Sequence, residues 1–335
     1  MNDIFNLSYA IKNRLWKLEL NCFKLQANMR YYEGGKGMET KIIFIGNYKG
    51  GVGKTTSVLN FAEYFSKENN KSNTGKNRVL VLDIDPQSSL SEILVSKGGY
   101  GALSDLPAAE TLNYVFDLYI SKIDKYHSIE LKFDNAMIKS YKKIYDFVPS
   151  SLFYQENMGL DMLALKMKDD IQYLSILKNW IDTIKDNYDI ILIDCPPANN
   201  LITRSAFLMS DYYVIPTILD GLSTNGVVHY ISTIEDTYNE YCEKGADALI
   251  TKHFFGEKPQ LIGVFYNLLR GQVNYNEAKR DFEDAIENLT PYKRNIILNC
   301  EINNYIDIAR RTQEGNVSID KRDFEILAKE IIDRI

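Results

Sequence analysis

The sequence predicts an α/β fold with a doubly wound, mostly parallel β-sheet and helices on both faces. Short apolar runs alternate with longer amphipathic segments from Lys41 onward. The apolar runs are continuous and rich in β-branched residues, which is typical of strands buried on both faces. A glycine-rich turn joins the first run to the first amphipathic segment. Strands that alternate with helices in this way predict a doubly wound α/β fold.

Each element is predicted from its own hydrophobic pattern. The apolar runs that predict strands are residues 41–47, 78–85, 143–149, 188–194, 212–217, 261–267 and 295–299. The amphipathic segments that predict helices are residues 54–69, 108–125, 169–187, 200–210, 224–243, 274–288 and 321–334. The polar segment 69–77 predicts a turn between the first helix and the second strand. The last helix carries acidic residues beside its cations, so we expect it to pack against the protein and not to lie on a membrane.

Composition and cysteine spacing exclude several classes of protein. The 335-residue chain is 45% apolar and 25% charged, which excludes disordered and collagen-like chains. The net charge of −6 provides no overall basic field for nucleic acid, although it is compatible with a local basic patch. The 4 cysteines form no CxxC pair, and no apolar run approaches the roughly 18 residues of a membrane span. We therefore expect a soluble protein of a reducing compartment, without stable membrane insertion.

Residues 1–37 stand outside the alternating pattern. Apolar side chains at helical spacing predict an amphipathic helix within 11–25. Residues 33–35, Glu-Gly-Gly, can be encoded by a ribosome-binding sequence shortly upstream of a start codon at Met38. The sequence thus predicts an extension, either native or upstream of the true start, followed by a single domain at 38–335.

The strongest functional signal is the segment KGGVGKTT at 49–56, between a predicted strand and a predicted helix. A loop of small residues turns successive backbone N–H groups toward phosphate oxygens, and the helix N-terminus adds partial positive charge. We expect Lys54 to reach the β- and γ-phosphates and Thr55 to place its hydroxyl on Mg²⁺. The usual GxxxxGK[ST] spacing requires a glycine where this chain has Tyr48, and Lys49 precedes two glycines. The predicted nucleotide-binding residues of this P-loop are Lys49, Gly50, Gly51, Val52, Gly53, Lys54, Thr55 and Thr56.

Two other apolar runs end in aspartates. Asp83 and Asp85 close the run 78–85, and Asp194 closes 188–194. Ligands bind at the carboxyl edge of the parallel strands in this class of fold, so we expect these carboxylates near the P-loop. Asp83 and Asp85 share one side of their strand and could serve Mg²⁺-bound waters and an attacking water, whereas Asp194 suits an outer-sphere Mg²⁺ carboxylate. The alternatives are an exposed Asp-Pro turn and an ordinary strand end.

The motifs together resemble those of the ParA/MinD family of ATPases, which has a deviant Walker A motif of the form KGGVGKTT. The segment RVLVLDIDPQSSLS at 78–91 resembles the DxDPQ motif of that family, and IILIDCPP at 190–197 resembles its Walker B strand and second switch. Related family segments also match 143–151 and 301–315. The resemblance implies a ParA-type ATPase that uses ATP and Mg²⁺, forms an ATP-dependent homodimer and binds DNA non-specifically. It further implies that the protein partitions a plasmid or chromosome with a ParB-like adaptor.

The resemblance also implies roles for single residues. Asp85 would position or activate the hydrolytic water, and Asp83 would lie nearer the magnesium shell. Lys49 would reach across the dimer interface to the nucleotide of the partner subunit. Asn267 would contact adenine, with a turn residue at the strand end as the alternative. The implied catalytic residues are Lys49, Lys54 and Asp85, and the implied metal-site residues are Thr55, Asp83 and Asp194.

Location, cargo and DNA contacts follow from the same resemblance. It implies a cytoplasmic protein that associates with the nucleoid when ATP is bound. The alternative function is a positioning ATPase of the same family whose cargo is a protein complex or a membrane-associated machine. An iron–sulfur carrier is disfavoured because paired cysteines are missing. The candidate DNA contacts, which solvated helix faces explain equally well, are Arg270, Lys279, Arg280, Lys293, Arg294, Arg310 and Arg311.

Overall fold

The computed structural model describes residues 40–68, 78–125, 130–219, 223–269, 274–289, 294–303 and 322–335. These residues belong to one compact unit, Glu39–Ile335. The predicted extension 1–37 and the predicted turn 69–77 lie outside the described residues, as does most of the segment 301–315.

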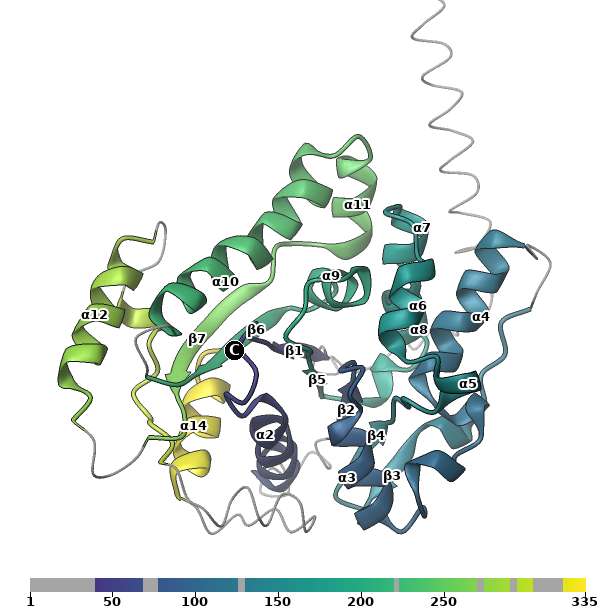
Figure 1. Ribbon diagram of the computed structural model, residues 1–335, viewed down its shortest axis with the longest axis horizontal. Helices are drawn as coiled ribbons and strands as arrows, with labels where there is room; N and C mark the ends of the chain where they lie inside the picture. Colours follow the sequence, from purple (N-terminus) through teal and green to yellow (C-terminus); the bar gives the residue numbers. More distant parts are fainter. Residues whose placement is uncertain are drawn as a thin grey trace, which may run out of the picture. The chain divides into compact units, whose positions relative to one another are not determined.

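A seven-stranded sheet forms the centre of the unit, in the order β3-β4-β2-β5-β1-β6-β7 (Figure 1). Every neighbouring pair is parallel except β3 and β4, which are antiparallel. The predicted α/β fold with a mostly parallel sheet is therefore confirmed. The strands are β1 (Lys41–Ile45), β2 (Val79–Asp83), β3 (Lys139–Tyr141), β4 (Tyr145–Val148), β5 (Ile190–Asp194), β6 (Tyr212–Thr217) and β7 (Gln260–Tyr266).

Helices cover both faces of the sheet (Figure 1). The described α-helices are α2 (Lys54–Glu68), α3 (Ser89–Gly98), α4 (Leu112–Asp124), α5 (Tyr154–Asn157), α6 (Leu160–Lys166), α7 (Ile171–Leu174), α8 (Ile176–Ile181), α9 (Leu201–Leu208), α10 (Ser223–Tyr238), α11 (Ala248–Phe255), α12 (Asn276–Glu287) and α14 (Arg322–Ile332). Short 3₁₀ turns occur at 103–105, 108–110, 135–137, 185–187 and 294–296, and a π-helical turn at 239–244 continues α10.

Two hydrophobic cores lie on opposite faces of the sheet. Successive strand residues alternate between them: Phe44 and Leu80 face the core under α4, α8, α9 and α10, whereas Ile43 and Val81 face the core under α2, α3 and α14. Because both faces are buried, the strands need apolar residues at every position, which explains the continuous runs in the sequence.

The closing helix packs as expected. On α14, Phe324, Leu327 and Ile331 are buried, and the rings of Phe324 and Phe61 of α2 lie edge to face with centroids 6.1 Å apart. Across the described ranges, no helix is both long enough and apolar enough to span a bilayer.

The structure corrects two predicted elements. The helix expected at 169–187 is divided into α7, α8 and a 3₁₀ turn. At the first division, Ser175 Oγ donates to Gln172 O and competes with the helical backbone pattern. The strand expected at 295–299 is wrong: this segment starts in a 3₁₀ turn and joins β7 only through an isolated bridge at Ile297 and a bond from Leu298 N to Val264 O.

Five described elements were not predicted from the sequence: β3, α3, α5, α6 and α11. The edge strand β3 has only three residues, and a tight turn with positive φ at Lys142 and Lys143 leads into β4. Helix α3 follows directly after the Asp-Pro segment, and α11 follows the π-helical turn. All five are short, so their hydrophobic period is poorly defined.

Gly263 of β7 provides a test of this packing. A Cβ atom there would lie 2.6 Å from Ile296 O and 2.6 Å from Leu298 Cδ2, and the first of these is a backbone atom that cannot turn away. We expect Gly263→Ala to lower the free energy of unfolding by about 1–3 kcal/mol, measured by urea denaturation.

Gly226→Ala is the matched control. Gly226 lies in α10 with no atom within 4 Å of an added Cβ. Alanine favours a helix over glycine, so this variant should keep or slightly raise stability. Equal stability of the two variants would contradict the described approach of residues 296–298 to β7.

Candidate functional site

The carboxyl ends of neighbouring strands bring the predicted site residues together. Strand β1 leads into the loop 46–53, which opens α2 at Lys54. Asp194 pairs in register with Ile45 on one side and with Asp83 on the other. Asn267 follows β7 at the same edge. The parallel register thus places the P-loop, both strand-end aspartates and Asn267 on one edge of the sheet, as the sequence predicted.

The P-loop has an open backbone that only glycine accommodates at two positions. Gly51 and Gly53 have φ of 72° and 85°, in the left-handed region. An added Cβ at Gly53 would lie 2.3 Å from Asn267 Nδ2, whereas nothing lies within 4 Å of one at Gly50 or Gly51. Val52 is buried and anchors the loop. The exposed backbone of Gly50 and Gly51 is therefore free to approach an anionic ligand closely.

Lys54 holds its ammonium group inside this loop. The side chain is buried, and Nζ donates to Asn47 O and to Lys49 O, at 3.0 Å each. Burial lowers the pKa of Lys54, and the nearby Asp194 carboxylate opposes that shift. A cation held by carbonyl oxygens at a helix N-terminus is suited to bind an anion such as phosphate.

Two asparagine side chains brace the loop. Asn47 Nδ2 donates to Pro216 O of β6 at 2.9 Å, and its Oδ1 accepts from Lys49 N at 2.9 Å. Asn267 Nδ2 donates to Val52 O at 2.8 Å, and its Oδ1 accepts from Leu268 N at 2.9 Å. Asn47 is not among the residues predicted from the sequence, where its only signal is that a polar residue directly follows an apolar strand. Both polar groups of Asn267 are bonded to backbone here, so its contact with adenine stays a prediction.

Tyr48 occupies the position where the usual motif has glycine. Its ring packs edge to face on Tyr230 of α10, with centroids 4.6 Å apart, and lies 6.3 Å from the ring of His229. The side chain is directed toward α10, so a large residue is compatible with the loop at this position.

Asp194 contacts the first turn of α2. Thr55 Oγ1 donates to Asp194 Oδ2 at 2.7 Å. Asp194 Oδ1 is buried and has no hydrogen-bond partner in the described part of the chain. Burial raises the pKa of Asp194 well above its ordinary value, and the neighbouring Asp83 charge adds to the shift. A buried carboxylate with an unpartnered oxygen is costly without a cation.

These features fit Mg²⁺ bound together with phosphate. Among the described residues, no group of three or more His, Cys, Asp or Glu side chains is arranged to hold a metal ion by itself. Mg²⁺ commonly uses one or two protein oxygens plus phosphate oxygens and water. The Thr55 hydroxyl and the unpartnered Asp194 oxygen are the protein groups that suit such an ion.

Asp83 differs from Asp194 although the two are neighbours. Its Oδ2 accepts from Ser91 N and Ser91 Oγ, and its Oδ1 accepts from Asp85 N at 3.1 Å. Burial raises the pKa of Asp83 to about 7, and the bonds from Ser91 oppose the shift. Its place in the magnesium shell stays a prediction, because these three hydrogen bonds are all within the protein.

The remaining predicted residues are more accessible. Asp85 is half-buried, and its Oδ1 accepts from Gln87 N at 2.9 Å. Lys49 is half-buried and Thr56 lies in the first turn of α2.

Cys195, directly after Asp194, is buried, and burial raises the pKa of its thiol well above the usual value, which agrees with a packing role.

Only two of the candidate DNA contacts can be described. Lys279 of α12 forms an ion pair with Glu301, and Arg280 is exposed. The side chain of Arg294 and residues Arg270, Lys293, Arg310 and Arg311 lie outside the described residues.

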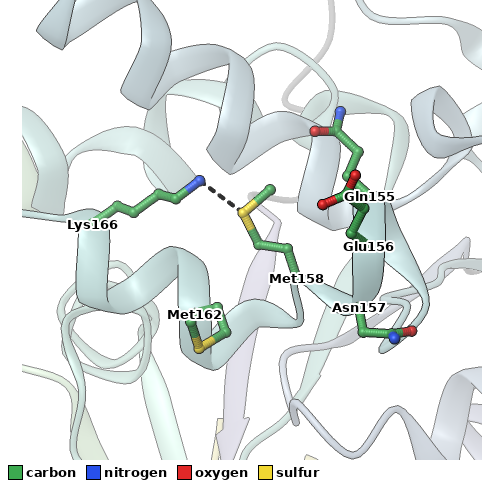
Figure 2. A pocket seen from close by; sticks show the side chains of 6 residues that line it. All are labelled: Gln155, Glu156, Asn157, Met158, Met162 and Lys166. Carbon is green, nitrogen blue, oxygen red and sulfur yellow. Dashed lines mark hydrogen bonds between the residues drawn. The ribbon is translucent and has the colours of Figure 1, made fainter.

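A separate surface cavity of about 680 Å³ lies at α5 and α6. Figure 2 shows Lys166 and Met158 facing one another there, with Lys166 Nζ donating to Met158 Sδ at 2.7 Å. The residues that line the cavity are Gln155, Glu156, Asn157, Met158, Met162 and Lys166. None of the predicted site residues lines it.

Comparisons with known proteins identify a matching family model and similar chains. The AAA_31 family model, described as an AAA domain, matches residues 40–244. An uncharacterized protein of Pseudomonas putida is 30% identical over 195 residues, and the match covers 58% of this chain and 62% of that protein. This share is less than two thirds of the relative's length. The sporulation initiation inhibitor protein Soj of Bacillus subtilis is 27% identical over 73% of this chain and 81% of its own length.

A solved structure has the same fold. It is a Borrelia burgdorferi protein, assigned to plasmid partition, that was crystallised with AMPPNP. The TM-score is 0.58 with 19% identity, and the match covers 88% of this chain and 98% of the other.

The position of Lys54 predicts that nucleotide binding depends on its charge. We expect Lys54→Ala to weaken ATP binding by about 10-fold or more, because charge-assisted bonds to phosphate are lost. Titration with a fluorescent ATP analogue measures this. The control is Lys67→Ala, in the last turn of the same helix, where the lysine pairs with Glu63. Unchanged affinity in Lys54→Ala would contradict the assignment of the loop.

Proposed function

This chain belongs to the AAA_31 family, in its ParA/MinD-type group, and from this we propose that it is a ParA-type ATPase that partitions a plasmid or chromosome. The observation that supports the proposal most is the P-loop. The Lys54 ammonium is held by the carbonyl oxygens of Asn47 and Lys49. Gly50 and Gly51 are open to an anionic ligand, and Thr55 bonds to Asp194. We further propose a cytoplasmic, nucleoid-associated protein in which residues 38–335 form a single domain after an extension of 1–37.

Different residues of the chain bind phosphate, bind the metal ion and position the attacking water. The N–H groups of residues 50–53 and the Lys54 ammonium bind phosphate, and the Thr55 hydroxyl and Asp194 hold Mg²⁺. ATP, when bound, supplies the bond between its β- and γ-phosphates that is hydrolysed. Asp85 accepts a hydrogen bond from the attacking water and orients it, since its carboxylate is only half-buried. The accessible carboxylate, Asp85, thus has the hydrolytic role, and the buried carboxylate, Asp194, has the metal role.

Lys49 completes the site from a second subunit. Lys54 already supplies the cation inside its own loop, and Lys49 stands at the opposite end of the glycine segment. In a dimer with its two sites face to face, each Lys49 would meet the phosphates of the partner subunit. An added cation at the transferring phosphoryl group stabilises charge as an arginine finger does.

We expect Lys49→Gln to keep ATP binding by the monomer but to lose ATP-induced dimerisation. Stimulated hydrolysis should fall by about 10³-fold, as on removal of an arginine finger. Analytical ultracentrifugation with ATP and a non-hydrolysable analogue measures the dimer. Lys97→Gln, at the C-terminal end of α3, controls for the loss of one surface cation. Normal dimerisation and hydrolysis in Lys49→Gln would mean that Lys49 is only a surface residue.

A measurement of DNA binding tests the proposed function in partition. We expect affinity to require ATP, to be equal for two unrelated duplexes, and to fall steeply with salt because phosphate neutralisation releases counterions. Fluorescence anisotropy across a salt series, with ATP and with ADP, measures this. Binding in neither nucleotide state at low salt would contradict partition. It would favour a positioning ATPase with a protein complex or membrane-associated machine as its cargo.

A further inference from the structure

Hydrogen-bond donors from α3 and from its own strand end surround Asp83. The side chain is 2% exposed. Its Oδ2 accepts from Ser91 N at 2.8 Å and from Ser91 Oγ at 2.6 Å, and its Oδ1 accepts from Asp85 N at 3.1 Å. A carboxylate has about four acceptor positions, so the protein itself occupies most of them.

The neighbouring aspartate has the opposite arrangement. Asp194 lies beside Asp83 in the register of β2 and β5 and is buried to the same degree. One of its oxygens contacts Thr55 in the P-loop helix, and the other has no partner in the described ranges. Of two adjacent buried carboxylates, one is therefore bonded to α3 and the other faces the P-loop.

Ser91 continues the hydrogen bonds from Asp83 to the end of β4. Ser91 Oγ donates to Asp83 and accepts from Ser150 N at 2.8 Å. Ser150 Oγ shares a hydrogen bond of 3.0 Å with Ser88 Oγ and lies 3.5 Å from Asp85 O. All three serines are buried, so water does not replace these bonds easily.

The turn between Asp83 and Ser91 carries Asp85 in a constrained conformation. Ser88 has φ of 52°, which is unfavourable for a residue other than glycine. Ser88 N donates to Asp85 O at 2.8 Å, and Gln87 N donates to Asp85 Oδ1 at 2.9 Å. Such a conformation persists only where its surroundings hold it. The groups that do so here are Asp83, Ser91 and Ser150.

We propose that Asp83 is a positioning residue that, through Ser91 and Ser150, holds the turn carrying Asp85 in one conformation, and that it is not a ligand of Mg²⁺. The bond from a serine hydroxyl to a buried carboxylate is charge-assisted and therefore strong for a neutral donor. The consequence for hydrolysis rests on the proposed function, in which Asp85 orients the attacking water. The consequence for the turn does not, because it concerns the protein without nucleotide.

Hydrogen exchange of the nucleotide-free protein tests the turn. We expect Ser91→Ala, and separately Ser150→Ala, to speed exchange of peptides covering 84–92 by about 10-fold. Ser210→Ala is the matched control, because Ser210 is also buried and donates a single hydroxyl bond, to Ala206 O at 2.7 Å. Unchanged exchange over 84–92 in both Ser91→Ala and Ser150→Ala would overturn the proposal.

Magnesium dependence separates a positioning residue from a metal ligand. The Mg²⁺ concentration that half-saturates binding of a fluorescent ATP analogue should stay within about 2-fold of wild type in Asp83→Asn, and should rise by about 10-fold in Asp194→Asn. An equal rise in both variants would make Asp83 a metal ligand and overturn the proposal.

Kinetics then test the link to Asp85. In Ser91→Ala and Ser150→Ala, kcat for ATP should fall by about 10-fold or more with KM unchanged, because misorientation of Asp85 affects the transition state and not binding. Faster exchange with unchanged kcat would overturn the link to hydrolysis. If wild-type protein does not hydrolyse ATP, the proposed function fails, while the exchange and magnesium measurements still decide the role of Asp83.

Discussion

Burial of two carboxylates side by side, Asp83 and Asp194, is the constraint on which the site depends. Parallel pairing of β2 with β5 places them in register at the carboxyl edge of the sheet, where both are almost fully buried. Buried charges are costly unless neighbouring groups donate to them or oppose their charge. Ser91, Thr55 and the Lys54 ammonium are the groups that do so. The first turn of α2, the first turns of α3 and the P-loop lysine are therefore all arranged around one pair of strand ends.

The P-loop itself depends on residues that lie far from it in the sequence. Its backbone is open because glycines occupy left-handed positions, and such a segment has little side-chain packing of its own. Asn47 ties it to β6, and Asn267 ties it to the end of β7. The aromatic contact between Tyr48 and Tyr230 adds a third attachment, to α10. The strands on one side of β1 thus hold the loop in the conformation that α2 requires.

The strands on the other side of β1 hold the Asp85 turn. Ser91 and Ser150 bond α3 to the segment after β4, so the turn is held by residues that follow β2 and by one that follows β4. The acidic turn follows β2 and the basic loop follows β1, so the sheet order places them on opposite sides of β5 at a common edge. This arrangement supports the assignment of separate roles to Asp85, Asp194 and Lys54.

The sequence by itself determined the fold class, the P-loop and the strand-end aspartates, because each depends on local pattern. Continuous apolar runs indicate strands buried on both faces of a sheet, and the glycine-lysine-threonine spacing predicts a loop between a strand and a helix. Tertiary structure decided the rest. Segments distant in sequence determine the strand order, the edge strand β3 and the absence of the predicted strand at 295–299. They also determine the hydrogen bonds of Asn47, Asn267 and Ser150. No periodicity or spacing encodes which of two buried aspartates receives its hydrogen bonds from α3, because that choice is made only when the helices pack on the sheet.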